Sequence, residues 1–228
     1  MKLFRLVFLV FIILTCCKKK DKTNHQQIEI NTKLKNKLEK ILLRDQGIRQ
    51  IVNGNLTKEQ KTKLYAKLNL KELEFEGNDT FELMRKIDSI NIIEVEKIVE
   101  KYGYPNKSMV GEPANKAVFY VVQHSEKIDK YLPIIREASK NGDISKAALA
   151  MMEDRNLMNQ GREQIYGTQI RGQESKSGKW IYFLWPLKNA DSVNIWRKQV
   201  GFEQNVEEYV KDMDVEFKLY TINDLKGL

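Results

Sequence analysis

Charged and amide side chains occupy helix positions at which the surrounding spacing calls for apolar residues. Asp45 lies within an apolar stripe that repeats every three or four residues from Leu38 to Val52. Asp88 and Asn91 interrupt a second stripe of the same kind. This spacing places the three polar side chains on the buried faces of two helices. Because a buried charge is costly unless it is paired, we expect these residues to meet other charged groups across a helical bundle.

His124 is suited to general acid or base chemistry, because an imidazole ordinarily titrates near neutral pH. Asp88 or Asp154 would orient this imidazole or share its proton. Arg49 and Arg155 would hold an anionic group or an oxyanion. The remaining candidates for ligand binding are the polar residues Asp45, Gln46, Asn91, Gln123, Gln164, Tyr166 and Gln169. The sequence therefore indicates a pocket for a small anionic or polar ligand, with hydrolysis as one possible reaction.

A second interpretation stays open. The same residues would form a buried network of salt bridges and amides that fixes the registry of the helices, because structural ion-pair networks resemble functional sites. His124 would then be a satisfied core residue, and the protein would be a non-catalytic interaction or structural module held at a membrane. The two interpretations differ in whether solvent reaches the polar residues. Residue types alone name neither a reaction nor a protein partner.

The sequence lacks the residues that several common kinds of functional site require. The histidines are His25 and His124, and the cysteines are Cys16 and Cys17, so the predicted domain holds one histidine and no cysteine. The usual zinc ligand set is therefore missing. The sequence also has no glycine-rich phosphate loop, no Gly-x-Ser-x-Gly motif and no dinucleotide-binding fingerprint. We predict neither a metal nor a cofactor.

The formal net charge of +8 is concentrated near the N-terminus. Basic residues in the first segment and a lysine run at 18–22 supply most of the excess, and +3 remains from residue 23 onward. A basic patch spread over a folded domain is the usual feature of nucleic-acid binding. We therefore predict no nucleic-acid partner.

Residues 1–16 have the pattern of a lipoprotein signal peptide. A basic start precedes an unbroken apolar run of nine residues, which is too short to span a bilayer. The run ends in Leu14-Thr15-Cys16-Cys17, which resembles a bacterial lipobox with Cys17 as the acylated residue and Cys16 as the alternative. We predict a lipid anchor in the bacterial cell envelope, facing the periplasm or the exterior, followed by a flexible basic tether at 17–27.

The pattern at 28–228 predicts a single, mainly α domain, a bundle of seven or eight helices with a small β-hairpin or sheet near the C-terminus. Apolar spacing, caps and Gly or Pro stops predict helices at 31–52, 57–68, 80–102, 113–124, 129–141, 144–159, 191–200 and 206–213. Runs of β-branched and aromatic residues predict strands at 164–169 and 180–185, joined by a long polar loop, and a last strand at 215–221.

The polar residues also fall into short motifs along the chain. These motifs are Asp45-Gln46-x-x-Arg49, Asp88-x-x-Asn91, Gly103-Tyr104-Pro105, Val110-Gly111, Gln123-His124, Asp154-Arg155, Gln164-x-Tyr166-Gly167-Thr168-Gln169 and Arg197-x-x-x-Gly201. In series, over about 34–209, they resemble the motifs of the domain-of-unknown-function 6624 family, although Tyr104 replaces a common tryptophan. The resemblance implies a bacterial, often secreted or lipid-anchored protein in which the polar series forms one site. It implies no particular activity.

Overall fold

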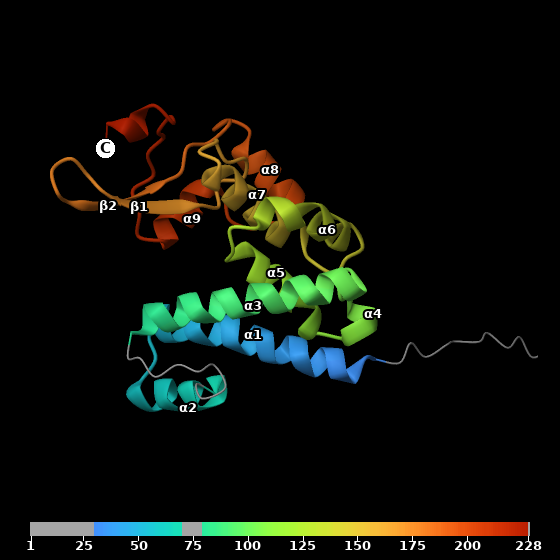
Figure 1. The fold of residues 1–228 in the computed structure, drawn as a ribbon. Coiled ribbons are helices and arrows are strands. Elements are labelled where there is room, and N and C mark those ends of the chain that lie inside the picture. The colour runs from blue at the N-terminus through green and yellow to red at the C-terminus, as the bar shows by residue number, and fades with distance from the viewer. Residues whose placement is uncertain (1–29, 70–78, 228) are drawn as a thin grey trace, which may run out of the picture.

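The computed structural model describes residues 30–69 and 79–227 (Figure 1). The predicted signal peptide, Cys17 and the tether lie outside these residues. Across the described ranges, no helix combines the length and the apolar character needed to cross a membrane. The prediction of a mainly α fold with a small β-hairpin near the C-terminus is confirmed.

The N-terminal half is built on two long helices that lie side by side, α1 (Thr32–Asn53) and α3 (Thr80–Tyr102), with α2 (Lys58–Leu68) packed against α1 (Figure 1). The predicted capping box of α2 is present, since Thr57 and Gln60 exchange hydrogen bonds. The Asp79 side chain caps α3, and Gly103, with a φ of 69°, ends it. The predicted boundaries of all three helices are therefore correct to within one residue.

Five shorter helical elements follow α3, and two of them correct the prediction. They are α4 (Lys107–Val110), the 3-10 turn η1 (Ala114–Lys116), α5 (Ala117–Gln123), α6 (Ile128–Lys140) and α7 (Lys146–Asn159). The helix predicted at 113–124 is divided into η1 and α5, and α4 was not predicted. A four-residue helix carries too little periodicity to stand out in a sequence.

The sheet is a two-stranded antiparallel hairpin of β1 (Ile170–Glu174) and β2 (Trp180–Leu184). The strand predicted at 164–169 is wrong, because the first strand begins one residue after that segment ends. The 164–169 segment is a loop in which Gly167 takes a φ of 65°. Buried side chains form hydrogen bonds with many of the backbone N–H and C=O groups of this loop. Residue types that favour β-strands therefore occur here in a buried loop.

The C-terminal part consists of α8 (Val193–Val200), α9 (Val206–Asp212) and the 3-10 turn η2 (Asp224–Lys226). The strand predicted at 215–221 is wrong, since the described segment pairs with no strand. Phe217 and Leu219 are exposed, so this run has no buried face to fix its register.

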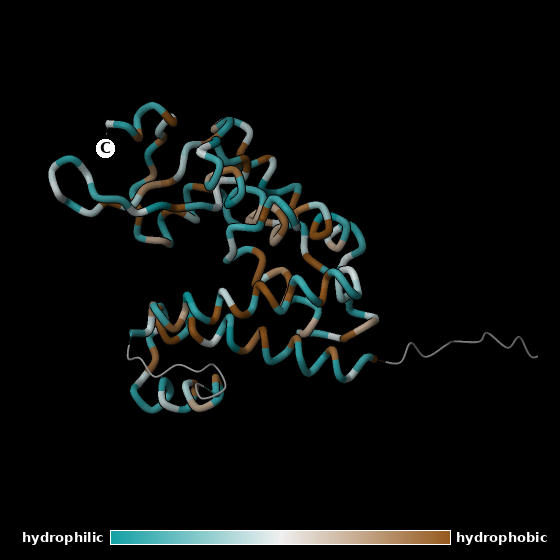
Figure 2. The backbone as a smooth tube through the Cα atoms, viewed as in Figure 1, coloured by the Kyte–Doolittle hydropathy of each residue, from teal (hydrophilic) through white to brown (hydrophobic). Residues whose placement is uncertain are grey.

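Two apolar clusters meet along α1 and α3. The larger cluster joins α1 and α3 to α4, α5, α6 and α7, and the smaller one consists of Ile48, Ile51, Leu68, Leu83 and Ile87. On α1, Asp45 lies between Ile41 of the larger cluster and Ile48 of the smaller one. Asn91 lies between the same two clusters on α3. Along both helices, hydrophobic residues recur among hydrophilic ones (Figure 2). The fold thus contains a polar layer between two apolar ones.

Candidate functional site

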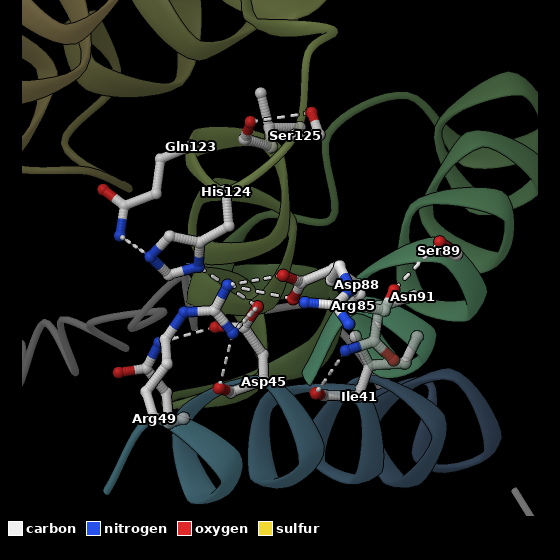
Figure 3. Close-up of polar contacts among 12 residues, drawn as sticks. Ile41, Asp45, Arg49, Arg85, Asp88, Ser89, Asn91, Gln123, His124 and Ser125 are labelled. Atoms are coloured by element: carbon white, nitrogen blue, oxygen red, sulfur yellow. Dashed lines mark hydrogen bonds and ion pairs between the residues drawn. The ribbon is translucent and has the colours of Figure 1, made fainter. Parts of the chain in front are cut away.

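Asp45 and His124 form the centre of this polar layer (Figure 3). Nδ1 of His124 lies 3.2 Å from Oδ1 of Asp45. α1 carries the carboxylate, and the imidazole follows the last turn of α5, where His124 is the C-terminal capping residue. The Nε2 amide of Gln46 donates to Oδ2 of Asp45 over 2.6 Å, so both carboxylate oxygens have partners. The predicted burial of Asp45 is confirmed, because its side chain is 1% exposed.

The neighbour of His124 fixes which ring nitrogen carries the proton. Nε2 of Gln123 lies 3.2 Å from Nε2 of His124. An amide nitrogen can only donate, so the Nε2 atom of the ring must accept this hydrogen bond. Nδ1 then carries the proton of the neutral imidazole and donates a hydrogen bond to Asp45. The ring therefore has its lone pair on Nε2, on the side away from the carboxylate.

Arg49 ties the two long helices together at this level. Its Nη1 atom donates to the backbone oxygen of Asp45 over 2.9 Å and lies 3.3 Å from the Oδ1 atom of the same residue. Its Nη2 atom donates to both carboxylate oxygens of Asp88, over 2.9 and 3.0 Å. Burial raises the pKa of Asp88, and the hydrogen bond and charge of Arg49 offset part of that increase. The expected meeting of the acids on α1 and α3 with an arginine is present.

Arg155 brings a second guanidinium to the site from α7. Its Nη1 atom donates to the backbone oxygen of Gln123, and its Nε atom donates to the side-chain oxygen of Gln169, both over 3.2 Å. Within 30–69 and 79–227, no carboxylate forms an ion pair with this residue. Burial and the positive charge of Arg49 lower the pKa of Arg155. Arg155 is thus a partly buried cation that feels the charge of Arg49 and has no carboxylate partner among the described residues.

Solvent reaches several side chains of the polar layer. The side chains of His124, Arg49 and Asp88 are 15%, 17% and 26% exposed, whereas Asp45 is closed off. Arg155 and Gln123 are also partly exposed. The carboxylate is therefore a buried support, and the imidazole and the arginines form the accessible surface.

Asp154 makes contacts that differ from those expected of a partner of His124. Its two oxygens accept hydrogen bonds from the backbone N–H groups of Ile165, Tyr166 and Thr168, and Oδ2 also accepts from the Thr168 hydroxyl. The side chain is fully buried. These contacts all go to the loop at 164–169, so Asp154 holds that loop in place.

Gln164 and Gln169 also stabilise the loop. The buried Gln164 amide donates to the backbone oxygens of Gln169 and Trp185 and accepts from the backbone N–H of Gln169. The Gln169 amide donates to the backbone oxygen of Met151, while its own oxygen accepts from Arg155. Gln169 therefore links the loop to the cation beside His124.

Asn91 and Tyr166 lie apart from the imidazole. The buried Asn91 amide donates to the backbone oxygen of Ile41 over 3.4 Å, which connects α3 to α1. The Tyr166 backbone is held by Asp154, and burial, with the charges of Glu153 and Asp154, raises the pKa of its phenol. No hydrogen bond from this phenol to the described residues is present. Contacts thus link seven of the predicted residues to His124, directly or through one another: Asp45, Gln46, Arg49, Asp88, Gln123, Arg155 and Gln169.

Arg197 is a structural residue that was singled out only as part of a motif. It is 2% exposed, and it donates to the backbone oxygens of Tyr166 and Gln204 over 2.8 and 2.9 Å. It thereby supports the same loop as Asp154, through backbone oxygens in place of N–H groups. Among the described residues, no group of three or more His, Cys, Asp or Glu side chains is arranged to hold a metal ion.

Comparison with known proteins places the chain in a family but assigns no activity. A family of unknown function (DUF6624) matches residues 66–221, which include His124, Arg155 and the 164–169 loop. Asp45, Gln46 and Arg49 lie before the matched range, although contacts join them to it. No curated protein and no solved structure matches the chain. The match spans more than half of the sequence, so the protein belongs to the DUF6624 family of unknown function.

Proposed function

We propose that the polar layer is a binding pocket for a small anionic ligand, in which His124 acts as a general acid or base. The observation that carries the proposal is the state of Arg155, a partly buried cation beside Arg49 with no acidic partner in the described chain. Such a cation is stabilised by an anion that enters from solvent. Carboxylate, phosphate and an oxyanion formed during hydrolysis share this chemistry.

The imidazole supplies the reactive group of the proposed site. Asp45 holds the Nδ1–H, so the Nε2 lone pair is available to take a proton from water or from a substrate hydroxyl. The amide of Gln123 occupies that lone pair, and its side chain is partly exposed, so rotation of the amide frees Nε2. Hydrolysis of an ester or a phosphoester next to the arginines is the reaction that this arrangement supports best.

Anion binding by the full-length chain tests the proposal. Titration calorimetry with inorganic phosphate and with acetate is expected to detect binding that Arg155→Met abolishes. Arg162→Met is the matched control, because Arg162 is exposed and its Nη1 atom contacts only Gln160. Turnover of 4-nitrophenyl acetate or 4-nitrophenyl phosphate, lost in a folded His124→Asn variant, would support the chemical step. If Arg155→Met and His124→Asn only lower the melting temperature and no anion binds to the unmodified chain, the residues form a registry network and the pocket proposal fails.

The proposal also places the protein in the bacterial cell envelope through a lipid on Cys17. Its support is the basic start, the short apolar run and the lipobox-like Leu14-Thr15-Cys16-Cys17. Two acyl chains would anchor the protein far more firmly than one.

The adjacent cysteines provide a matched pair of variants for this anchor. With labelled fatty acid in a bacterial host, Cys17→Ala is expected to lose the label and leave the membrane fraction. Cys16→Ala keeps a small residue before the cleavage site and should retain both. The reverse pattern would move the lipid to Cys16, and labelled membrane protein in both single variants would remove the lipobox assignment.

A further inference from the structure

An apolar groove lies beside the candidate site. It has a volume of about 510 Å³ and runs between α1, α2 and α5. Its apolar walls are Leu42, Leu43, Gly47, Leu64, Pro113 and Tyr120. This volume is within the range of about 300–1,000 Å³ that is typical of small-molecule pockets. Glu39 and Lys116 supply charge at the margin of the groove.

Gln46 connects the groove to the Asp45–His124 pair. Its side chain lines the groove and also donates the 2.6 Å hydrogen bond to Oδ2 of Asp45. Tyr120 lies one helical turn before His124 at the end of α5, and residues four apart share a face of a helix. Gln46 and the turn from Tyr120 to His124 therefore place the groove next to the Asp45–His124 pair.

The direction of the chain supports this placement. At the start of α1, the backbone N–H of Asn31 donates to the oxygen of Met109, and further along Asp45 meets His124. α1 and the segment that ends in α5 thus advance in the same direction. The groove flanks residues 39–50 of α1, the stretch that also carries Asp45 and Arg49.

The margins of the groove favour a small molecule over a docked helix of a partner protein. The polar residues Glu39, Gln46, Gln50 and Lys116 interrupt its apolar lining. A docked helix would need a continuous apolar channel over several turns.

We propose that the ligand of the Arg155–His124 site is an amphiphilic anion. Its charged head group lies against Arg155 and Arg49, and its apolar chain or ring lies in the groove beside Leu43 and Tyr120. This inference rests on the proposed anion site and adds the substrate class to it. The head group sets the position of the bond to be cleaved beside Nε2 of His124, and the apolar part supplies much of the affinity.

A series of straight-chain carboxylates tests the inference on the purified full-length chain. Calorimetric affinities for acetate, butanoate, hexanoate and octanoate are expected to rise by about fourfold for each buried methylene until the groove is full. Leu43→Trp places a larger side chain in the groove without touching the core, because Leu43 is 37% exposed. This variant should bind acetate normally and lose the dependence on chain length.

Ile93→Trp is the matched control, since Ile93 is 51% exposed on α3 and does not line the groove. It should keep the full chain-length dependence. Equal affinities for acetate and octanoate would overturn the inference and leave the anion site in place. The same gain with chain length in Leu43→Trp would place the chain elsewhere and also overturn it. If no carboxylate binds, or if octan-1-ol binds as well as octanoate, the anionic head group and the proposed function both fail.

Discussion

Nδ1 of His124 lies 3.2 Å from Oδ1 of Asp45, although 79 positions separate the two residues in the chain. Gln123 donates to the opposite ring nitrogen, so the contacts select the neutral tautomer with the proton on Nδ1. A carboxylate that holds one nitrogen and leaves the other as an acceptor is the arrangement used to orient catalytic histidines. The resemblance concerns the arrangement alone, because no nucleophilic side chain of the described residues contacts the ring.

We predict that ¹⁵N NMR of the imidazoles will show the Nδ1–H tautomer for neutral His124. The measurement is simple because the chain has only two histidines, and His25→Gln identifies the other signal. Asp45→Asn is expected to shift neutral His124 toward the Nε2–H form, because the charged acceptor is lost. An Nε2–H tautomer in the unmodified chain would contradict the assignment and require the amide of Gln123 to be turned over.

The two arginines of the site should respond differently to removal of their charge. Arg49→Met leaves the carboxylates of Asp45 and Asp88 without their cation, and we expect a loss of about 3 kcal/mol in the free energy of unfolding. Arg155→Met removes two hydrogen bonds but no ion pair, and also relieves repulsion by Arg49, so we expect a loss of about 1 kcal/mol or less. Urea unfolding at pH 7 measures both values.

Arg136→Met provides the control for this comparison, because its ion pair with Glu153 is at the surface and should contribute about 0–1 kcal/mol. Equal losses for Arg49→Met and Arg155→Met would show that Arg155 has a structural partner equivalent to a carboxylate. The pocket proposal would then lose the observation that carries it.

The sequence predicted the burial of Asp45 and Asn91 because an interrupted helical stripe specifies a face. Asp88, predicted to be buried in the same way, is 26% exposed, because it lies at the open margin of the layer. The sequence did not predict that Arg49 bridges to Asp88. That contact depends on how α1 and α3 are aligned along their axes, and packing sets the alignment. Spacing along one helix carries no information about its register against another.

Asp154 illustrates a different limit of sequence analysis. The sequence marks it as a candidate partner of His124, but its partners are backbone N–H groups of a loop that composition predicts to be a strand. Backbone groups have no signature in the sequence, so an acid that binds them looks the same as an acid that orients a histidine. The missing counter-ion of Arg155 was hidden for a related reason, because an absent contact is visible only once the neighbours are placed.

Glu96 leads to a pH-dependent prediction. Hydrogen bonds from Lys127 and Lys130 lower the pKa of its carboxyl from 4.5 to about 2. Because the folded-state pKa is the lower one, the stabilisation is fully present above about pH 4.5 and is lost as the pH falls toward 2. We expect Glu96→Gln to cost about 1 kcal/mol at pH 7, since the cluster is partly exposed.

Urea unfolding of the unmodified chain and of Glu96→Gln, from pH 7 down to pH 2, checks this prediction. The difference between the two free energies of unfolding should shrink across the range below pH 4.5. Glu126→Gln is the control, because Glu126 is exposed and lies outside the cluster. A difference that stays constant with pH would show that the ionised carboxylate of Glu96 is not the stabilising species.

Asp154→Asn should separate a loop anchor from a catalytic acid. Asparagine has one accepting oxygen in place of two, and its amide nitrogen cannot accept, so part of the hydrogen bonds that Ile165, Tyr166 and Thr168 donate is lost. We expect a loss of about 3 kcal/mol in stability. Hydrogen exchange at those three amides should accelerate. Thr168→Val removes only the hydroxyl contact and should cost about 1 kcal/mol.

The same variant affects the candidate site through Gln169, because that residue joins the loop to Arg155. We therefore expect Asp154→Asn to weaken anion binding, and the loss of affinity should follow the increase in the rate of amide hydrogen exchange in the loop. Conditions that slow this exchange should also restore anion binding. A variant with unchanged stability and slow amide exchange that nevertheless loses turnover would contradict the anchor role. Asp154 would then orient His124 or share its proton, the role that the sequence predicts for Asp88 or Asp154.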